Sequence, residues 1–402
     1  MRKITNYFPW ITLVILCIYG VGINSLRNSF QFFLPYLAKD FNGTVTSIAL
    51  SSGIFMVSSG IGGVISGWLI DRISIRKSLL LGNIIILLAA ITLFQLVTAP
   101  SFVIVYGLIG GLGYGMSWGV PTQYYISQWF EKSKGLALAL LNNCNSLGLA
   151  VLAPIWSRLS KNQPWQTTYR SLAICLLIII PIVLITLRNP NQQKTAKTNN
   201  TPSTWKTTIK TAYYSKSIKY AFSAVFVCGF SMGIIDTQLV SMMINNQIST
   251  DKTGILMSLF GIIVIIGGLF SGIISDKQKK RIAVLQWLFL GRTISFLLLL
   301  LPVISIIKYS LFVLLFGLTY SGVVMLAVLL IVESKTAVTG KLLSINMLIH
   351  QFSGLLGVYL SSKLLDIFAN YFAISLIALS LSLFVLLYGI KINDFKSKGE
   401  VL

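Results

Sequence analysis

The sequence predicts an all-α membrane protein in which twelve transmembrane helices form two similar bundles of six. The 402 residues are 55% hydrophobic and only 10% charged, with a mean hydropathy of +0.81. Apolar runs of about 20 residues, each long enough to span about 30 Å of hydrocarbon, recur along the chain. A short pattern of a glycine, an aspartate and several basic residues occurs once in each half. We expect helices because continuous apolar runs do not fit the alternating strands of a membrane barrel.

The expected spans lie near residues 9–37, 44–70, 78–97, 102–126, 135–158, 168–187, 219–244, 253–275, 282–301, 309–332, 341–362 and 367–390. A polar stretch rich in asparagine, threonine and lysine separates the sixth span from the seventh. This order predicts an N-terminal bundle over residues 1–187, a cytoplasmic linker at 188–218, a C-terminal bundle over 219–390 and a cytoplasmic tail at 391–402.

The distribution of charge indicates an orientation in the membrane. The chain has 32 Lys and Arg against 10 Asp and Glu, a formal net charge of +22. If the amino terminus is cytoplasmic, most basic residues fall in cytoplasmic loops and tails, the bias that orients helices during insertion. Nucleic acid is not an expected partner, because no basic patch is interleaved with exposed aromatic residues. We expect a multi-pass protein of the cell membrane, such as a bacterial inner membrane, with both termini cytoplasmic.

The sequence predicts no enzyme, no cofactor and no metal site. It contains no paired carboxylates, no G-x-S-x-G nucleophile motif, no G-x-x-x-x-G-K-[ST] phosphate loop and no cluster of metal ligands. The four cysteines lie in predicted spans without zinc-ligand spacing, and we interpret them as packing residues. The first apolar run lacks a small-residue cleavage site, so we expect it to remain as a span.

The repeated pattern follows the second span of each half. The first copy contains Gly67, Asp71, Arg72, Arg76 and Lys77, and the second contains Gly272, Asp276 and Lys280. The aspartates lie at helix carboxyl ends, where the helix dipole disfavours an anion, so basic residues or a neighbouring helix must stabilise them. We expect the glycines to let that helix approach closely. The alternative is that these are solvated loop charges that only fix the orientation.

Two six-helix halves with these loops resemble the major facilitator superfamily of transporters. The first copy matches the family's G-x-x-x-D-[RK]-x-G-x-[RK]-[RK] loop except at Ser74, where glycine is usual. Residues 129–137 resemble the W-F-x-x-x-[RK]-G-x-A segment of oxalate/formate-antiporter-like and monocarboxylate-transporter-like members, and residues 27–35, 226–230 and 350–351 are similar to the same branch. The resemblance implies small organic anions as the substrate class and implies that the two loops latch the halves on the cytoplasmic side.

Arg27 lies well inside the first span, where an unpaired charge costs several kcal/mol. Helical spacing places Asn24, Asn28 and Gln31 on the same face, so this face should contact protein or water rather than lipid. We interpret Arg27 as the group that binds a substrate carboxylate, because its planar guanidinium suits bidentate contact. The alternatives are a structural ion pair or a side chain that reaches the outer surface.

Two residues are candidates for proton coupling. Asp236 holds the matching place in the seventh span, where it would take up a proton or pair with the arginine of the first span. His350, the only histidine, shares a face of the eleventh span with Asn346, Ser353 and Gly357, and its titration would suit proton coupling or substrate binding. For both residues the alternative is a hydrogen-bonded structural role.

Polar residues in other spans are further candidates for substrate binding: Tyr114, Ser117, Asn142, Asn145 and Tyr320. The fourth span also has glycines at a spacing of four, which favours close helix packing: Gly107, Gly111, Gly115 and Gly119. Arg292, near the start of the ninth span, is interpreted as structural or as snorkelling to the cytoplasmic surface.

Together these features predict a secondary transporter, acting as a monomer in the lipid bilayer, that moves a small organic anion by alternating access. Proton symport and anion exchange are both open. The eighth and eleventh spans have no interior basic residue, although members of this branch carry one, and this absence weighs against a carboxylate. One alternative is an exporter of a neutral, zwitterionic or amphipathic metabolite, with Arg27 and Asp236 as an internal ion pair. The other is a non-transporting membrane sensor.

Overall fold

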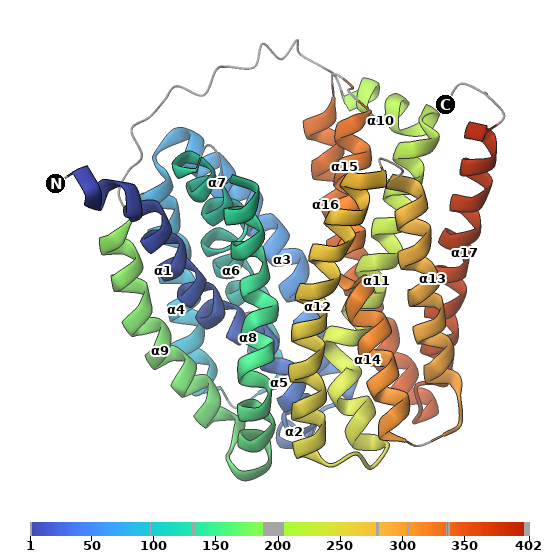
Figure 1. The fold of residues 1–402 in the computed structure, drawn as a ribbon. Helices are drawn as coiled ribbons and strands as arrows, with labels where there is room; N and C mark the ends of the chain where they lie inside the picture. The colour runs from blue at the N-terminus through green and yellow to red at the C-terminus, as the bar shows by residue number, and fades with distance from the viewer. Residues whose placement is uncertain are drawn as a thin grey trace. The chain divides into compact units, whose positions relative to one another are not determined.

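The structure is a computed structural model, and its description covers residues 2–96, 98–130, 134–187, 205–278, 281–303, 305–334, 336 and 338–397. Within these ranges the side chains of residues 2–7, 134, 135, 205, 276, 278 and 393–397 are not described. All regular structure in the described ranges is helical (Figure 1).

The helices of the N-terminal part are α1 (Arg2–Asn28), α2 (Phe30–Asp40), α3 (Val45–Arg72), α4 (Ile75–Leu93), α5 (Ala99–Phe102), the π-helix η1 (Val103–Gly110), α6 (Gly111–Ser117), α7 (Val120–Trp129), α8 (Lys134–Asn162) and α9 (Trp165–Thr186). Those of the C-terminal part are α10 (Trp205–Tyr214), α11 (Lys216–Asn245), α12 (Thr250–Gln278), α13 (Arg281–Leu300), α14 (Ile306–Tyr320), α15 (Gly322–Glu333), α16 (Thr339–Phe368) and α17 (Phe372–Ser397). By length and composition, twelve segments of the described chain can cross a membrane. The predicted number of spans is therefore confirmed.

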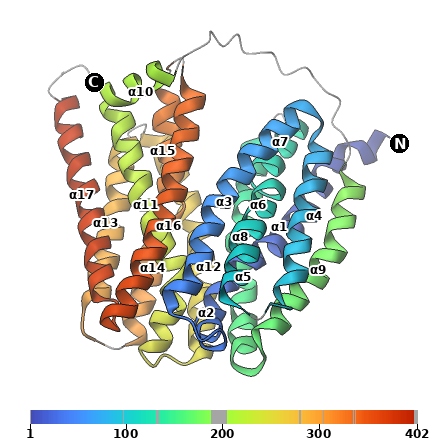
Figure 2. The same ribbon diagram turned by 180° about the vertical axis from the view of Figure 1, so that it is seen from behind.

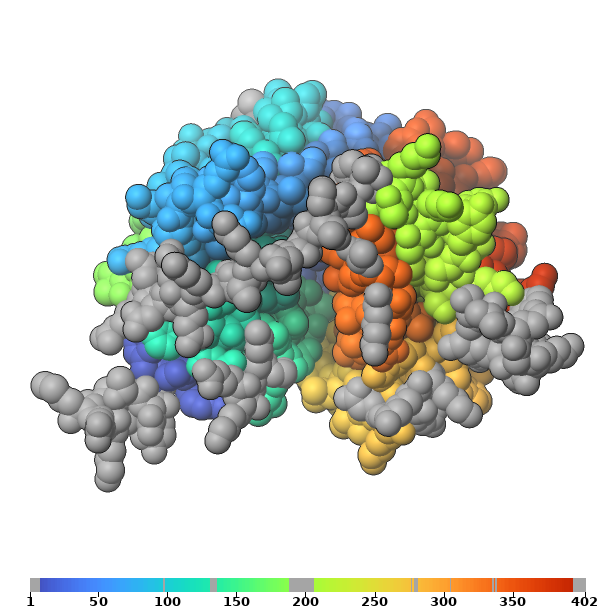
Figure 3. Space-filling model, turned by 90° about the horizontal axis from the view of Figure 1, so that it is seen from above, coloured from blue at the N-terminus to red at the C-terminus, as the bar shows by residue number. Residues whose placement is uncertain are grey.

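The chain divides into two compact units. Unit 1 contains residues 1–193 and 249–258, and unit 2 contains residues 194–248 and 259–402. Part of the stretch expected to be a linker is the short helix α10, which packs beside α11 and α16 in unit 2 (Figure 3). Its exposed face carries Ile209, Tyr213 and Tyr214. Residues 205–214 of the expected linker are therefore helical.

In unit 1, α3 packs along η1 and α6, and α1 packs along α8. A Cβ added at Gly107 would lie 2.9 Å from the carbonyl oxygen of Ser51, and one at Gly111 would lie 2.7 Å from that of Phe55. Gly115 meets the backbone of α3 in the same way. The helix backbones therefore touch along this seam, which confirms the packing role predicted for these three glycines.

The fourth span is broken rather than continuous. After α6 ends, Trp118 is extended and Gly119 adopts a φ of +80°, a conformation that favours glycine. The break turns the indole of Trp118 against α1, where a Cβ added at Gly20 would lie 2.7 Å from a ring carbon. Two other spans are interrupted, at Ser29 in the first and at Ser321 in the tenth. Each interruption lies next to a polar residue that the sequence predicts to bind substrate.

In unit 2, the long helix α11 packs against α16 and also contacts α14, α15 and α17, while α13 lies along α17 (Figures 1 and 2). The backbones of α11 and α16 touch. A Cβ added at Gly233 would lie 2.9 Å from the carbonyl carbon of Gly354 and closer still to its oxygen. A Cβ at Gly357 would lie 2.9 Å from the carbonyl carbon of Phe230. This contact fixes the two helices that carry Asp236 and His350.

Candidate functional site

Arg27 lies in the last turn of α1 with its side chain partly exposed. One turn earlier, Asn24 is fully buried and its Nδ2 donates a hydrogen bond to the carbonyl oxygen of Gly20 at 2.7 Å. The hydroxyl of Tyr114, on α6, donates to Asn24 Oδ1 at 2.6 Å. Two residues predicted to bind substrate thus contact each other directly beside the helix turn that carries the guanidinium.

The predicted asparagines of α8 have separate partners. Asn28 Nδ2 donates to Asn145 at two atoms, Oδ1 at 3.0 Å and the carbonyl oxygen at 3.2 Å. Asn142 is exposed, and its Oδ1 accepts from Gln123 Nε2 at 2.7 Å. The first pair joins α8 to the arginine-bearing helix α1, whereas the second joins α8 to α7.

Gln31 and Ser117 lie in the interior of unit 1, with 3% and 0% of their surface exposed. Among the described residues, neither Gln31 Oε1 nor the Ser117 hydroxyl has a hydrogen-bond partner. The carbonyl oxygen of Ser117 lies 3.3 Å from the hydroxyl of Tyr19, which donates to Asn83 Oδ1 at 2.6 Å. The tyrosine and asparagine are fully buried and were not predicted from the sequence, although an asparagine inside the apolar third span is a usable signal.

Asp236 and Tyr320 contact each other in unit 2. The Tyr320 hydroxyl lies 2.6 Å from Asp236 Oδ1 and 2.8 Å from Oδ2. A phenol has one proton, so the two carboxylate oxygens share it, and the bond is of the short, charge-assisted kind. The sequence named both residues but placed the tyrosine in a substrate-binding role. The structure joins the two residues and so links α11 to the end of α14.

The polar face predicted for the eleventh span is buried, which confirms the helical spacing. Asn346, His350 and Ser353 have 8% or less of their surface exposed, and Gly357 is buried on the same face. This face packs on α11, because a Cβ added at Gly229 would lie 3.0 Å from the carbonyl carbon of His350. The histidine is therefore enclosed by the contact between α11 and α16.

Arg292, on α13, is fully buried, so the snorkelling interpretation is wrong. Its Nη1 donates to the hydroxyl of Ser231 and its Nη2 to the carbonyl oxygen of Thr319, both at 2.9 Å. The guanidinium carbon lies 5.0 Å from the ring centre of Phe316 and 5.7 Å from that of Phe289. Nε has no hydrogen-bond partner among the described residues. The side chain joins α13 to α11 and to the end of α14, one residue before the tyrosine that contacts Asp236.

The first charged loop is more open than expected. Asp71 is exposed and forms no ion pair with any described residue. The guanidinium of Arg72 instead lies 4.4 Å from the ring centre of Trp68. A Cβ added at Gly67 would meet no atom within 4 Å. The prediction that this glycine lets a neighbouring helix approach closely is therefore wrong within unit 1.

Ser74 has a local role in this loop. It is the N-cap of α4, and its hydroxyl accepts from the backbone N–H of Lys77 at 3.3 Å. Arg76 and Lys77 are exposed in the first turn of the same helix. A serine therefore suits a position where the family usually has glycine, because it satisfies one free amide of the helix end.

The second loop is described only in part. The side chain of Asp276 is not described, and Lys280 lies outside the described residues. A Cβ added at Gly272 would make ordinary contact, 3.8 Å from a methionine side chain. The described part of this region contains an ion pair that the sequence did not predict. Arg281 Nε lies 3.0 Å from Glu333 Oε1 and joins the start of α13 to the end of α15.

Twelve segments able to cross a membrane, with polar and charged side chains inside several of them, define a multi-pass membrane protein. The model of the Major Facilitator Superfamily matches residues 12–358, and the chain belongs to this superfamily. It is 38% identical over 371 residues to an uncharacterized MFS-type transporter, YcxA, of Bacillus subtilis (strain 168), covering 91% of this chain and 90% of the relative. It is 20% identical over 278 residues to monocarboxylate transporter 12 of Homo sapiens, covering 61% and 52%. Its fold is similar to that of a mutant of the nucleoside transporter NupG, with a TM-score of 0.78, 14% identity and coverage of 94% and 99%.

Proposed function

We propose that this transporter moves a small organic anion across the membrane of a bacterial cell by alternating access, and that Arg27 binds the carboxylate. The observation that carries the proposal is a partly exposed guanidinium in the last turn of α1, beside the buried bond between Asn24 and Tyr114. A guanidinium inside a span requires protein, water or a ligand to solvate it. Its two parallel N–H groups fit a carboxylate in a way that lysine does not reproduce.

The neighbouring amide supports an anion rather than a cation. Asn145 accepts from Asn28 through Oδ1, so its own Nδ2 group is left to donate. An amide N–H group donates to acceptor oxygens, such as those of a carboxylate, and does not bind a cation. The name of the human relative, a monocarboxylate transporter, supports the same substrate class.

Asp236 is the proposed proton-coupling group. The Tyr320 hydroxyl reaches both carboxylate oxygens, so a proton gained on one oxygen leaves the contact through the other intact. Protonation thereby changes the charge of α11 without releasing α14. Proton symport requires Asp236 to gain and lose a proton in each cycle, whereas exchange of one anion for another does not. His350, enclosed between α11 and α16, is a second candidate for the same role.

The test is uptake of radiolabelled lactate, pyruvate, formate and oxalate into proteoliposomes that contain the full-length protein. We expect Arg27→Gln to lower uptake of the transported anion by about tenfold or more, because a charge-assisted hydrogen bond is worth about 1.5–3 kcal/mol. Arg170→Gln, which removes an exposed arginine from α9, is the matched control and should transport like the wild type. No uptake of any of these anions by the wild type would reject the proposal.

The same vesicles test the proton site. We expect Asp236→Asn to lose uptake driven by an inward proton gradient while retaining exchange of internal for external anion. Gradient-driven uptake equal to that of the wild type would exclude Asp236 from coupling. Counterflow of a neutral or zwitterionic solute that is unaffected by Arg27→Gln would support the alternative substrate class.

A further inference from the structure

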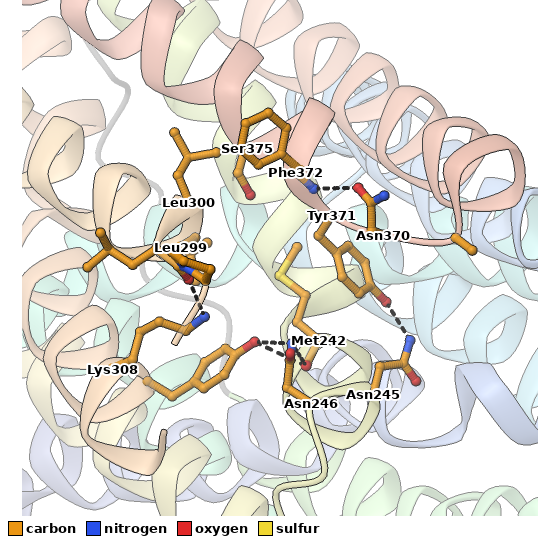
Figure 4. Close-up of a pocket in the computed structure, with 14 residues that line it drawn as sticks. Met242, Asn245, Asn246, Leu299, Leu300, Lys308, Asn370, Tyr371, Phe372 and Ser375 are labelled. Atoms are coloured by element: carbon orange, nitrogen blue, oxygen red, sulfur yellow. Dashed lines mark hydrogen bonds between the residues drawn. The ribbon is translucent and has the colours of Figure 1, made fainter. Parts of the chain in front are cut away.

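Unit 2 contains a cavity at the end of α11 farthest from α10. Its volume is about 520 Å³. Three segments line it: the carboxyl end of α11, the connection between α13 and α14, and the connection between α16 and α17 (Figure 4). None of the residues proposed for transport lines this cavity, so it requires its own explanation.

The cavity is lined by a lysine that has no acidic partner among the described residues. Lys308 is only 9% exposed, and its Nζ donates one hydrogen bond, to the carbonyl oxygen of Leu301 at 3.2 Å. The ammonium also lies 5.3 Å from the ring centre of Tyr309. No lining residue is acidic, and Lys308 forms no ion pair with any residue that the structure describes. An ammonium has three N–H donors, and a buried charge is costly unless it is paired, so this site favours an anion.

Two further donors line the same cavity. The hydroxyl of Tyr371 accepts from Asn245 Nδ2 at 3.3 Å, which leaves its proton free to donate. The hydroxyl of Ser375, 3% exposed, forms no hydrogen bond with a described residue. Figure 4 shows Lys308 on one side of the cavity and Tyr371 and Asn245 on the other. The polar lining therefore offers donors, as anion recognition requires.

The remaining lining is apolar, with Leu299, Leu300 and Phe372 among its residues. The connection between α16 and α17 is also held in a defined shape. Ala369 adopts a φ of +54°, uncommon for a residue other than glycine. Asn370 Oδ1 accepts from the backbone N–H of Phe372 at 3.0 Å. A cavity with donors, an apolar wall and a fixed connection suits a ligand that is part anion and part hydrocarbon.

We propose that this cavity binds an amphipathic organic anion, with Lys308 contacting its carboxylate or phosphate group and the leucines contacting its apolar portion. A soluble organic acid and the headgroup of an anionic lipid share this chemistry. The site goes beyond the proposed transport function, because it uses neither Arg27 nor Asp236 and would bind whether or not the anion is transported.

The test measures the thermal stabilisation of the full-length purified protein by two probes in detergent. Benzoate represents a soluble acid, and dihexanoyl-phosphatidylglycerol represents a lipid, with dihexanoyl-phosphatidylcholine as its control. We expect concentration-dependent stabilisation of the wild type by benzoate. In Lys308→Met the apparent Kd should rise by about tenfold or more, since a charged hydrogen bond is lost. Lys363→Met removes an exposed lysine from α16 and should bind like the wild type.

A second variant, Ser375→Phe, fills the cavity without removing a charge and should also abolish binding. Binding of phosphatidylglycerol but not of benzoate or phosphatidylcholine would assign the site to a lipid headgroup and still support the proposed chemistry. Because the proposed transport site at Arg27 also binds carboxylates, both variants are compared again in an Arg27→Gln background. Benzoate binding that remains there and is lost with Lys308→Met belongs to this cavity, so failure of the transport proposal leaves the inference intact. The proposal is overturned if neither anion stabilises the wild type, or if Lys308→Met and Ser375→Phe bind with wild-type affinity.

Discussion

The contact between α11 and α16 yields the most direct prediction, because a single methyl group tests it. In Gly233→Ala the new Cβ would lie 2.9 Å from the carbonyl carbon and 3.0 Å from the Cα of Gly354. Unstrained carbon atoms are about 3.5–4.0 Å apart, so the two helices must separate by about 0.5–1 Å. Overpacking of this kind costs about 1–3 kcal/mol. The better helix propensity of alanine offsets up to about 1 kcal/mol of that cost.

Gly340→Ala is the matched control. Gly340 lies in the first turn of α16, is exposed, and a Cβ added there meets no atom within 4 Å. This variant gains the propensity of alanine without the clash. We therefore expect Gly233→Ala to be less stable than Gly340→Ala by about 2 kcal/mol, or roughly 4–8 °C in unfolding midpoint for a unit of this size.

The assay is thermal unfolding of the purified variants in detergent, followed by tryptophan fluorescence, with size-exclusion chromatography to check that each variant is monodisperse. Transport should fall with stability, because α11 carries Asp236 and α16 carries His350. If Gly233→Ala unfolds at or above the midpoint of Gly340→Ala, the backbones of α11 and α16 do not touch and the reasoning is refuted.

Three further predictions concern polar contacts. Tyr320→Phe removes the hydroxyl that contacts both oxygens of Asp236 and should destabilise the protein by about 1.5–3 kcal/mol, measured by chemical unfolding. An unchanged unfolding midpoint would contradict this contact. Tyr19→Phe leaves the fully buried Asn83 without its hydroxyl partner and should cost about 1–3 kcal/mol, whereas Tyr213→Phe, at an exposed position, should be neutral. In a double-mutant cycle on the free energy of unfolding, Arg281→Gln and Glu333→Gln should have a coupling energy of only about 0.2–1 kcal/mol, because the side chain of Glu333 is 49% exposed. A larger coupling energy would indicate an ion pair that solvent does not reach.

The sequence by itself determined the number, order and helical nature of the spans, because the length of an apolar run is a local property that the bilayer thickness fixes. It also determined which face of the eleventh span is buried, since helical spacing alone brings Asn346, His350 and Ser353 together. Nearby residues do not determine how each helix is turned about its own axis relative to its neighbours. This rotation depends on side chains that are distant along the chain, and the sequence does not display their contacts.

Only the tertiary structure therefore decided which polar groups meet. Tyr320 binds Asp236 because α14 ends beside α11, and Arg292 is buried because two helices and two phenylalanine rings surround it. Gly67 fits the family pattern, yet no described atom of unit 1 lies within 4 Å of a Cβ added there. Lys308 resembles an ordinary interfacial lysine in the sequence. It is buried only because the carboxyl end of α11 and two connections between helices meet around it. Burial of a charge is a property of the packed chain, because distant segments must come together to exclude water from it.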